Sequence, residues 1–299
     1  MVPPLLSYIT FNRLGLTVQN LPAILQSTDD FEMHIIDNNS YDGTWDYLQS
    51  VQDVRIKSKT RVQVNSGQIY ALNLNLTHRR PDQYFIAVDN DVHIETKDWI
   101  SRFMKVFEEF PEVGLLGVQR GYPYPQDLPP VTPQLKNGAL YLELDKNSVD
   151  PNGAFLPGCC QCLRPELIKE IGYWSEENGF GDIELCFRVS HFTSFKVGFV
   201  PSISIRMPQT IECHNCPYES QCHLDKYRNT CFTIYEKLYK NHEFVKKFNW
   251  KLIETFKDMK TGARPVYCAS ALDGNALANH IFNLNWALEN FRFYIDNAN

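Results

Sequence analysis

Two carboxylates stand one residue apart in this chain, at Asp89 and Asp91, directly after the apolar run at residues 84–88. Such a run is typical of a buried strand, so both carboxylates should emerge at its carboxyl end. In an open α/β sheet ligands bind at that edge, and two oxygen donors at this spacing can hold a divalent cation against a diphosphate. The triplet therefore indicates a metal-dependent nucleotide site, although an isolated Asp-x-Asp is more often an acidic turn.

Further polar clusters adjoin the other strands expected in the first third of the chain. They are Thr10, Asn12 and Arg13 after residues 5–9, Asp37 and Asn39 after residues 33–36, and Asn65 and Gly67 ahead of residues 84–88. Apolar residues at helical spacing predict a helix over residues 14–26, and turn-forming residues precede a second helix that begins at Trp45. Because the carboxyl ends of parallel strands meet at one edge of a sheet, the clusters predict a single site.

Four blocks of the chain resemble the family 2 glycosyltransferases, the large inverting group with the GT-A fold. The blocks are residues 35–44, 65–73, 85–91 and 171–188, and the resemblance covers about residues 5–205. It implies an α/β fold of the GT-A type, a Rossmann-like mixed sheet flanked by helices, followed by a helical C-terminal extension. It also implies transfer of a sugar from a nucleotide-diphosphate sugar with inversion at the anomeric carbon.

The resemblance implies a role for each acidic position. Asp182 would be the general base that takes the acceptor proton; capping of a helix over residues 183–189 is its structural alternative. Asp91 would bind Mg²⁺ or Mn²⁺ directly, and Asp89 would be shared between the ribose and the ion. Asp37 would accept a hydrogen bond from the base, which favours uracil or guanine, and we expect a UDP-sugar. The other nucleotide-sugar-binding candidates are Thr10, Asn12, Arg13, Asn39, Gly67 and Asn90.

Two positions depart from the family pattern. Gly181 stands where the family usually has an acidic residue before the one matched by Asp182. The family also often has a metal-binding histidine just beyond the strand expected at residues 200–205, where this chain has Arg206. The alternatives for that role are His214, from a shifted loop, and the charge of Arg206 itself.

The length and composition of the chain are typical of a catalytic domain with an added segment. A chain of 299 residues with 43% hydrophobic content can bury a full core and exceeds the usual single-domain size. We expect a GT-A glycosyltransferase domain at residues 1–210 and a cysteine-containing loop with a helical extension at residues 211–299. Neither a long apolar run nor a charged-then-apolar leader is present, which predicts a cytoplasmic protein without a transmembrane segment.

Nine cysteines without an export signal favour reduced thiols or metal ligands over disulfides. One group has the spacing Cys-x2-Cys-x5-Cys-x8-Cys and consists of Cys213, Cys216, Cys222 and Cys231. Four thiolates can hold a structural Zn²⁺ in tetrahedral geometry, and an iron–sulfur cluster has similar needs. The alternative is packing in a core. A second group at residues 159–162 lies in an apolar run and is expected to be buried.

Three segments outside the four blocks bear on the acceptor. Five prolines at residues 121–133 predict a long loop, which is either an acceptor platform or a plain surface excursion. Residues 224–260 have helical periodicity and a net charge of +4, whereas the whole chain carries −6. This segment is either a solvated helix face or a surface for a polyanionic acceptor, such as nucleic acid or a phosphate-containing polymer. Residues 276–294 predict a helix that packs on the domain or forms a homo-oligomer.

Two other classes of function remain open from the sequence. One is a retaining GT-A transferase or a nucleotidyltransferase on a similar sheet. The other is a non-catalytic module that binds sugar or nucleic acid, which Gly181 and the missing histidine would suit. The anomeric configuration of the product separates inversion from retention, and release of pyrophosphate would identify a nucleotidyltransferase.

Overall fold

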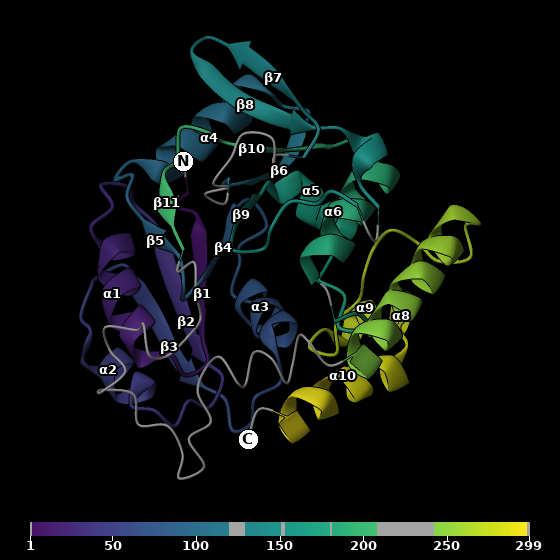
Figure 1. Ribbon diagram of the computed structural model, residues 1–299, viewed down its shortest axis with the longest axis horizontal. Helices are drawn as coiled ribbons and strands as arrows, with labels where there is room; N and C mark the ends of the chain where they lie inside the picture. Colours follow the sequence, from purple (N-terminus) through teal and green to yellow (C-terminus); the bar gives the residue numbers. More distant parts are fainter. Residues whose placement is uncertain (1, 120–128, 151–152, 180, 208–241, 298–299) are drawn as a thin grey trace.

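The computed structural model describes residues 2–119, 129–150, 153–179, 181–207 and 242–297. These residues form a nine-stranded mixed sheet in the order β3-β2-β1-β4-β9-β6-β10-β8-β7, together with a small β11-β5 sheet. Helices cover both faces of the large sheet (Figure 1). The expected α/β fold with a mixed sheet is confirmed.

The first third of the chain alternates strands and helices, and the sequence predicts all of these elements except the strand at residues 56–61 and the helix at residues 68–76. The elements are β1 Leu5–Thr10, α1 Leu14–Leu25, β2 Glu32–Asp37, α2 Thr44–Ser50, β3 Ile56–Arg61, α3 Gln68–Leu76 and β4 Phe85–Asp89. The four strands are parallel, and the register places Thr10 beside Asp37 and Ile9 beside Asp89. The polar strand ends identified in the sequence therefore lie at one edge of the sheet.

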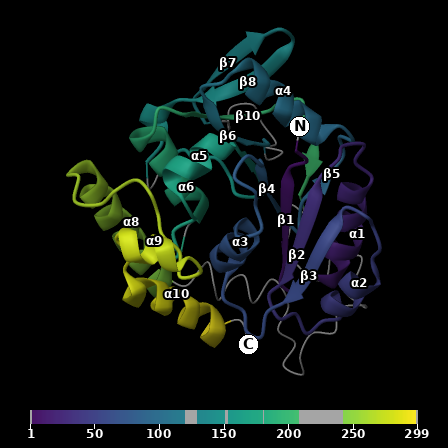
Figure 2. The same cartoon turned by 180° about the vertical axis from the view of Figure 1, so that it is seen from behind.

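The rest of the chain adds strands in both directions and the remaining helices. The elements are β5 His93–Ile94, α4 Trp99–Glu109, β6 Val113–Gly117, β7 Val131–Lys136, β8 Ala139–Leu144, η2 Lys146–Ser148, β9 Cys160–Leu163, α5 Pro165–Ile171, α6 Gly181–Phe192, β10 Lys196–Phe199, β11 Ile205–Arg206, α8 His242–Lys260, α9 Gly274–Asn279 and α10 Leu284–Asn297. Strand β9 lies between β4 and β6 and is antiparallel to both. Helices α8, α9 and α10 lie together on one side of the molecule (Figures 1 and 2).

Two layers of apolar side chains hold the helices on the sheet. Successive residues of β1 point to opposite faces, so Leu6 and Tyr8 join one layer while Leu5 and Ile9 join the other. The first layer contains residues of α1, α2 and α4, including the fully buried Trp99. The second contains residues of α3, α5, α6 and α8. The C-terminal helix α8 is therefore part of the main core.

Three element boundaries differ from the sequence-based predictions. The strand expected at residues 200–205 is wrong, because β10 ends at Phe199 and a turn leads into β11. Residues 131–133 of the expected loop begin β7, where Pro133 is tolerated because β7 is an edge strand. The single helix expected over residues 276–294 is broken into α9 and α10.

The break between α9 and α10 has a local cause. The side chain of Asn283 accepts a hydrogen bond from the amide of Trp286 at 3.2 Å, which caps the start of α10. The apolar face that suggested one helix is exposed, since Leu284 and Leu288 are 54% and 40% accessible. Among the described residues, no helix combines the length and apolar character that crossing a membrane requires.

Candidate active site

A cavity of about 500 Å³ opens at the carboxyl edge of β1 and β4. Its walls come from the segments after these strands, from α3, from the segment before β9, and from the first residues of α6, with α10 also contributing. Seven of the predicted site residues line it, namely Asn12, Arg13, Gly67, Asp89, Asn90, Asp91 and Asp182. The structure thus brings the Asp-x-Asp segment and the predicted base into one cavity.

Asp91 is only partly satisfied by protein groups. Its Oδ2 atom accepts a hydrogen bond from Arg13 Nη1 at 2.8 Å, and the two side chains form an ion pair that is about four-fifths buried. Its Oδ1 atom is buried and has no hydrogen-bond partner in the described part of the chain. A buried carboxylate oxygen without a partner is costly, so this atom marks a place where a ligand would complete the structure.

The neighbouring carboxylate of Asp89 is held by the start of α3. Its Oδ1 atom accepts a hydrogen bond from Gln68 Nε2 at 2.5 Å. Gln68 follows Gly67, whose φ of +84° favours glycine. Between the two carboxylates, Asn90 donates to the carbonyl of Asn12 and to Thr17 Oγ1 at 3.4 Å each. The side chain of Asn90 therefore ties the β1 and β4 ends together.

Asn12 presents a second unpartnered atom at the cavity. Its side chain is 1% exposed, and its Oδ1 atom accepts a hydrogen bond from the amide of Tyr41 at 3.0 Å. Its Nδ2 group has no hydrogen-bond partner among the described residues. The donor Asn12 Nδ2 and the acceptor Asp91 Oδ1 are thus two buried polar atoms without a hydrogen-bond partner among the described residues.

Asp37 lies behind this wall and does not line the cavity. It is fully buried, accepts hydrogen bonds from Thr10 Oγ1 at 3.1 Å and from the Ser40 amide at 2.9 Å, and forms an ion pair with Arg61. Burial raises the pKa of its carboxyl group, and these hydrogen bonds oppose the rise. Thr10 is buried as well, and Asn39 is half-buried in the left-handed region at φ 65°. In this structure Asp37 joins Thr10 to Ser40, whose hydroxyl accepts a hydrogen bond from the Asn12 amide at 2.7 Å.

Asp182 lies within the first turn of α6, because the helix begins at Gly181. Its Oδ2 atom accepts a hydrogen bond from the Gly158 amide at 3.1 Å, and Oδ1 accepts one from the Ile183 amide at 2.9 Å. The helix expected over residues 183–189 therefore starts earlier, and Asp182 is not the residue that flanks it. Asp182 is one of the residues that line the cavity, as are Gly158 and Ile183, whose amides donate to it.

The glycine that departs from the family pattern has a packing reason. A Cβ atom on Gly181 would lie 3.0 Å from Cγ1 and 3.2 Å from Cδ1 of Ile69. The start of α6 therefore approaches α3 closely, and a larger residue would require Ile69 to move.

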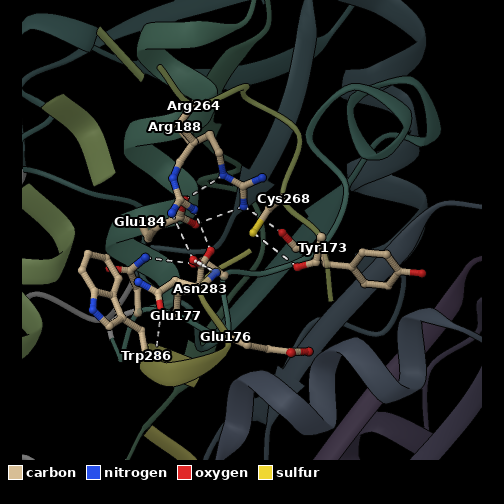
Figure 3. Close-up of polar contacts among 12 residues, drawn as sticks. Tyr173, Glu176, Glu177, Glu184, Arg188, Arg264, Cys268, Asn283 and Trp286 are labelled. Carbon is tan, nitrogen blue, oxygen red and sulfur yellow. Dashed lines mark hydrogen bonds and ion pairs between the residues drawn. The ribbon is translucent and has the colours of Figure 1, made fainter. Parts of the chain in front are cut away.

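A buried ionic network holds α6 in place. Glu184 and Arg188 are fully buried and form two hydrogen bonds of 2.8 and 3.0 Å (Figure 3). Glu177 accepts two hydrogen bonds from Arg264 at 2.7 and 3.0 Å. Glu176 accepts hydrogen bonds from three groups, two of which belong to residues 270–271. Because Glu184 is buried against Arg188, it is a scaffold residue in this structure. No sequence pattern pointed to Arg264, because its partner Glu177 is distant in the chain.

The chemistry of the donor set fits a cation shared with a ligand. Mg²⁺ is commonly bound through one or two carboxylates together with substrate phosphates, and Asp91 has a buried oxygen to offer. The described residues contain no group of three histidine, cysteine or acidic side chains that could hold a metal by themselves. Arg206 pairs with Glu95 on an exposed surface and does not line the cavity.

The other proposed metal ligands lie outside the residues that the structure describes. Cys213, Cys216, Cys222 and Cys231 are outside the described residues, as is His214. The Zn²⁺ hypothesis therefore stays a prediction. The three cysteines at residues 159–162 are buried, as the sequence predicts.

The fold is that of known GT-A glycosyltransferases. It is similar to the mannosyltransferase PcManGT from Pyrobaculum calidifontis, solved with GDP-Man and Mn²⁺, at 15% identity and a TM-score of 0.53 over 98% of this chain and 85% of that one. It is also similar to S. aureus TarS 1-349 with UDP-GlcNAc, at 14% identity and a TM-score of 0.52 over 98% and 82% of the two chains. In a longer TarS structure the match covers 48% of that chain.

Residues 8–172 match the model of the family described as Glycosyl transferase family 2. This match covers more than half of the chain, so the protein belongs to glycosyl transferase family 2. None of the curated proteins compared with the chain matches it.

Proposed function

We propose that this glycosyltransferase uses a UDP-sugar and a divalent cation, and that it inverts the anomeric centre with Asp182 as the general base. The observation that carries the proposal is the shared cavity, in which Asp91 with its unpartnered Oδ1 atom and the carboxylate of Asp182 come from different elements. One carboxylate suits the cation and diphosphate, and the other suits the acceptor. Two separated acidic functions are what an inverting transfer requires.

The residues after β1 and β4 would bind the donor. Asp91 and Asp89 would hold Mg²⁺ or Mn²⁺, which stabilises negative charge on the diphosphate leaving group. Asn12 Nδ2 would donate a hydrogen bond to a ligand oxygen, since it has no partner among the described protein groups. Arg13 would keep Asp91 oriented through their ion pair of 2.8 Å.

Asp182 would accept the proton of the attacking acceptor group. The amides of Gly158 and Ile183 donate to its two oxygens, which orients the carboxylate. Its position in the first turn of α6 adds the positive end of the helix dipole. A carboxylate that is already oriented can take a proton without reorganisation.

The C-terminal segment is included in the proposal. Helix α10 contributes to the cavity, so we propose that residues 211–299 complete the site. The acceptor is proposed to be polyanionic because of the positive charge at residues 224–260. The exposed leucines on α9 and α10 would suit contact with a second copy of the chain.

A thermal-shift panel of nucleotide sugars tests the proposal. UDP-, GDP- and dTDP-sugars are compared with and without Mn²⁺, because a ligand that binds the native state raises its stability. We expect the largest rise with a UDP-sugar and Mn²⁺ together, and loss of most of it with EDTA. A rise unaffected by EDTA would refute the metal assignment, and anomeric analysis of the transfer product would test inversion.

A further inference from the structure

Tyr294 connects the C-terminal helix α10 to the candidate active site. Its side chain is 6% exposed, lines the cavity, and packs with Phe11 and Tyr41. Phe11 belongs to the segment after β1, and Tyr41 to the segment after β2. Two members of this aromatic cluster, Phe11 and Tyr294, therefore line the same cavity as the carboxylates.

The ring of Tyr294 lies directly against Gly67. A Cβ atom on Gly67 would be only 2.6 Å from both Cδ2 and Cε2 of the ring, and the φ of +84° at this residue also favours glycine. Gly67 is itself held, because its amide donates to Asn65 Oδ1 at 2.9 Å and its carbonyl accepts from Asn38 Nδ2 at 3.4 Å. The loop before α3 and the ring of Tyr294 thus form one wall.

Helix α10 is held in place by buried polar groups. Asn290 is 4% exposed, and its Nδ2 group donates to the carbonyl of Glu176 at 2.6 Å. The amide of Asn283 donates to Glu177 Oε1 at 2.5 Å (Figure 3). Lys251 of α8 donates to Asn290 Oδ1 at 2.9 Å. Because each contact is buried or partly buried, the helix delivers Tyr294 to a fixed position.

A second ring contact fixes the next turn of the helix. Phe291 meets Tyr70 of α3 edge-to-face with 5.3 Å between ring centroids. Helix α3 also provides Gln68, which hydrogen-bonds to Asp89. The position of Tyr294 is thereby linked to the element that holds the acidic end of the cavity.

The cavity is lined both by carboxylates and by the ring of Tyr294, and a nucleotide sugar presents both a diphosphate and a planar base. Carboxylates that can share a cation suit the diphosphate, whereas an aromatic wall suits a planar base. We propose that Tyr294 forms part of the base subsite and contributes to nucleotide affinity through contact of its ring with the base. This inference rests on the proposed function, because it assumes a nucleoside diphosphate donor.

The test compares ligands with and without a base. Binding of UDP and of inorganic pyrophosphate, each with Mn²⁺, is measured by isothermal titration calorimetry on the full chain. The variants are Tyr294→Ala, Tyr294→Leu and Tyr294→Phe. Leu288→Ala is the matched control, because Leu288 lies on the same helix and is 40% exposed. Circular dichroism melts identify any variant that does not fold.

We expect Tyr294→Ala and Tyr294→Leu to weaken UDP binding by about tenfold, since an aromatic contact with a base has this order of effect. Tyr294→Phe and Leu288→Ala should stay within about twofold of wild type, because a ring is kept at residue 294 in both proteins. Pyrophosphate binding should be unchanged in all four. In turnover, the ring-less variants should raise KM for the donor and leave kcat near wild type.

Three results would overturn the inference. Unchanged UDP binding in the ring-less variants would show that the ring makes no contact with the base. Tighter binding would show that the ring blocks the site. An equal loss of UDP and pyrophosphate would show a purely structural role. Should Tyr294→Ala fail to fold, Tyr294→Leu decides. Failure of the proposed function has a different signature, because wild type itself would then bind neither UDP nor GDP.

Discussion

The acidic residues at the strand ends of the cavity differ in their hydrogen bonding from those of the ionic network that packs against α6. At the strand ends Asp91 keeps a buried oxygen without a partner among the described residues, and nearby Asn12 keeps an unpartnered donor. Beneath α6, Glu176 accepts three hydrogen bonds and Glu177 accepts three, including both from Arg264. Both regions bury acidic side chains, but of those compared only Asp91 has a carboxylate oxygen without a hydrogen-bond partner among the described residues.

This difference distinguishes acidic residues that would bind a ligand from acidic residues that stabilise the fold. A buried acid that is saturated by protein donors gains nothing from a ligand, whereas an unpartnered oxygen is stabilised by one. The comparison predicts that changes at the cavity reduce activity and leave stability nearly intact. Changes in the ionic network should do the reverse.

The largest effect is expected for Asp182→Asn. Asparagine is close in shape but cannot accept the acceptor proton, so transfer should fall by about 10²- to 10⁴-fold. Nucleotide-sugar affinity and thermal stability should stay near wild type, and Glu95→Gln, at an exposed acidic position, is the control. Steady-state kinetics with parallel binding measurements check this. Substantial turnover by the variant would give Asp182 a structural role.

The next effect is expected for Asp91→Asn. Loss of the charge beside the cation should lower transfer by about 10²-fold or more and weaken Mn²⁺-dependent nucleotide binding. Asp89→Asn should cost less, because Gln68 already occupies one of its oxygens. Titration of Mn²⁺ in the presence of UDP provides the measurement. Equal Mn²⁺ affinity in wild type and Asp91→Asn would remove Asp91 from the metal site.

Arg264→Met, a change in the ionic network, should reduce stability more than activity. The substitution leaves Glu177 as a buried charge without its main partner, which typically costs about 3–5 kcal/mol. Arg206→Met is the matched control, since the Arg206–Glu95 pair is exposed and should contribute less than about 1 kcal/mol. Urea denaturation gives both free energies of unfolding. Similar losses for the two variants would contradict the role assigned to burial.

A smaller, pH-dependent effect is expected outside both regions, at His34 of β2. Burial, aided by the neighbouring His78, lowers the pKa of His34 from 6.5 to about 4. Because the folded-state pKa is lowered, the contribution of His34 to the free energy of unfolding is fully present above pH 6.5. This contribution is lost as pH falls from 6.5 towards 4. The loss should reach about 2–3 kcal/mol. His34→Phe should show a shallower decline in unfolding free energy over this range, and an unchanged slope would refute the assignment.

The strand ends were predictable because they depend on local patterns. An apolar run followed by Asp89 and Asp91 requires only the strand and its direction, and the same holds for Asn12. The structure brings these residues together at the cavity. Asp37 also follows a strand, but whether its carboxylate reaches the cavity depends on the donors that Ser40 and Arg61 supply.

The contribution of the C-terminal helices could not be derived in this way. Tyr294 reaches Gly67, and Arg264 reaches Glu177, through packing between segments far apart in sequence. The apolar periodicity of residues 276–294 predicted one helix with a buried face. In the structure the capping side chain of Asn283 starts a new helix, and the periodic leucines are exposed. The capping hydrogen bond of Asn283 overrode the apolar periodicity at this point.

The most direct test of the central claim is the identity of the nucleotide product. Wild-type protein is incubated with the preferred nucleotide sugar and Mn²⁺, and phosphorus NMR follows the products, with water as the acceptor if no other is known. We predict release of the nucleoside diphosphate, with Asp91→Asn as the inactive comparison. Release of the nucleoside monophosphate with the sugar 1-phosphate would instead show cleavage within the diphosphate and contradict glycosyl transfer, and intact binding without any conversion would contradict catalysis altogether.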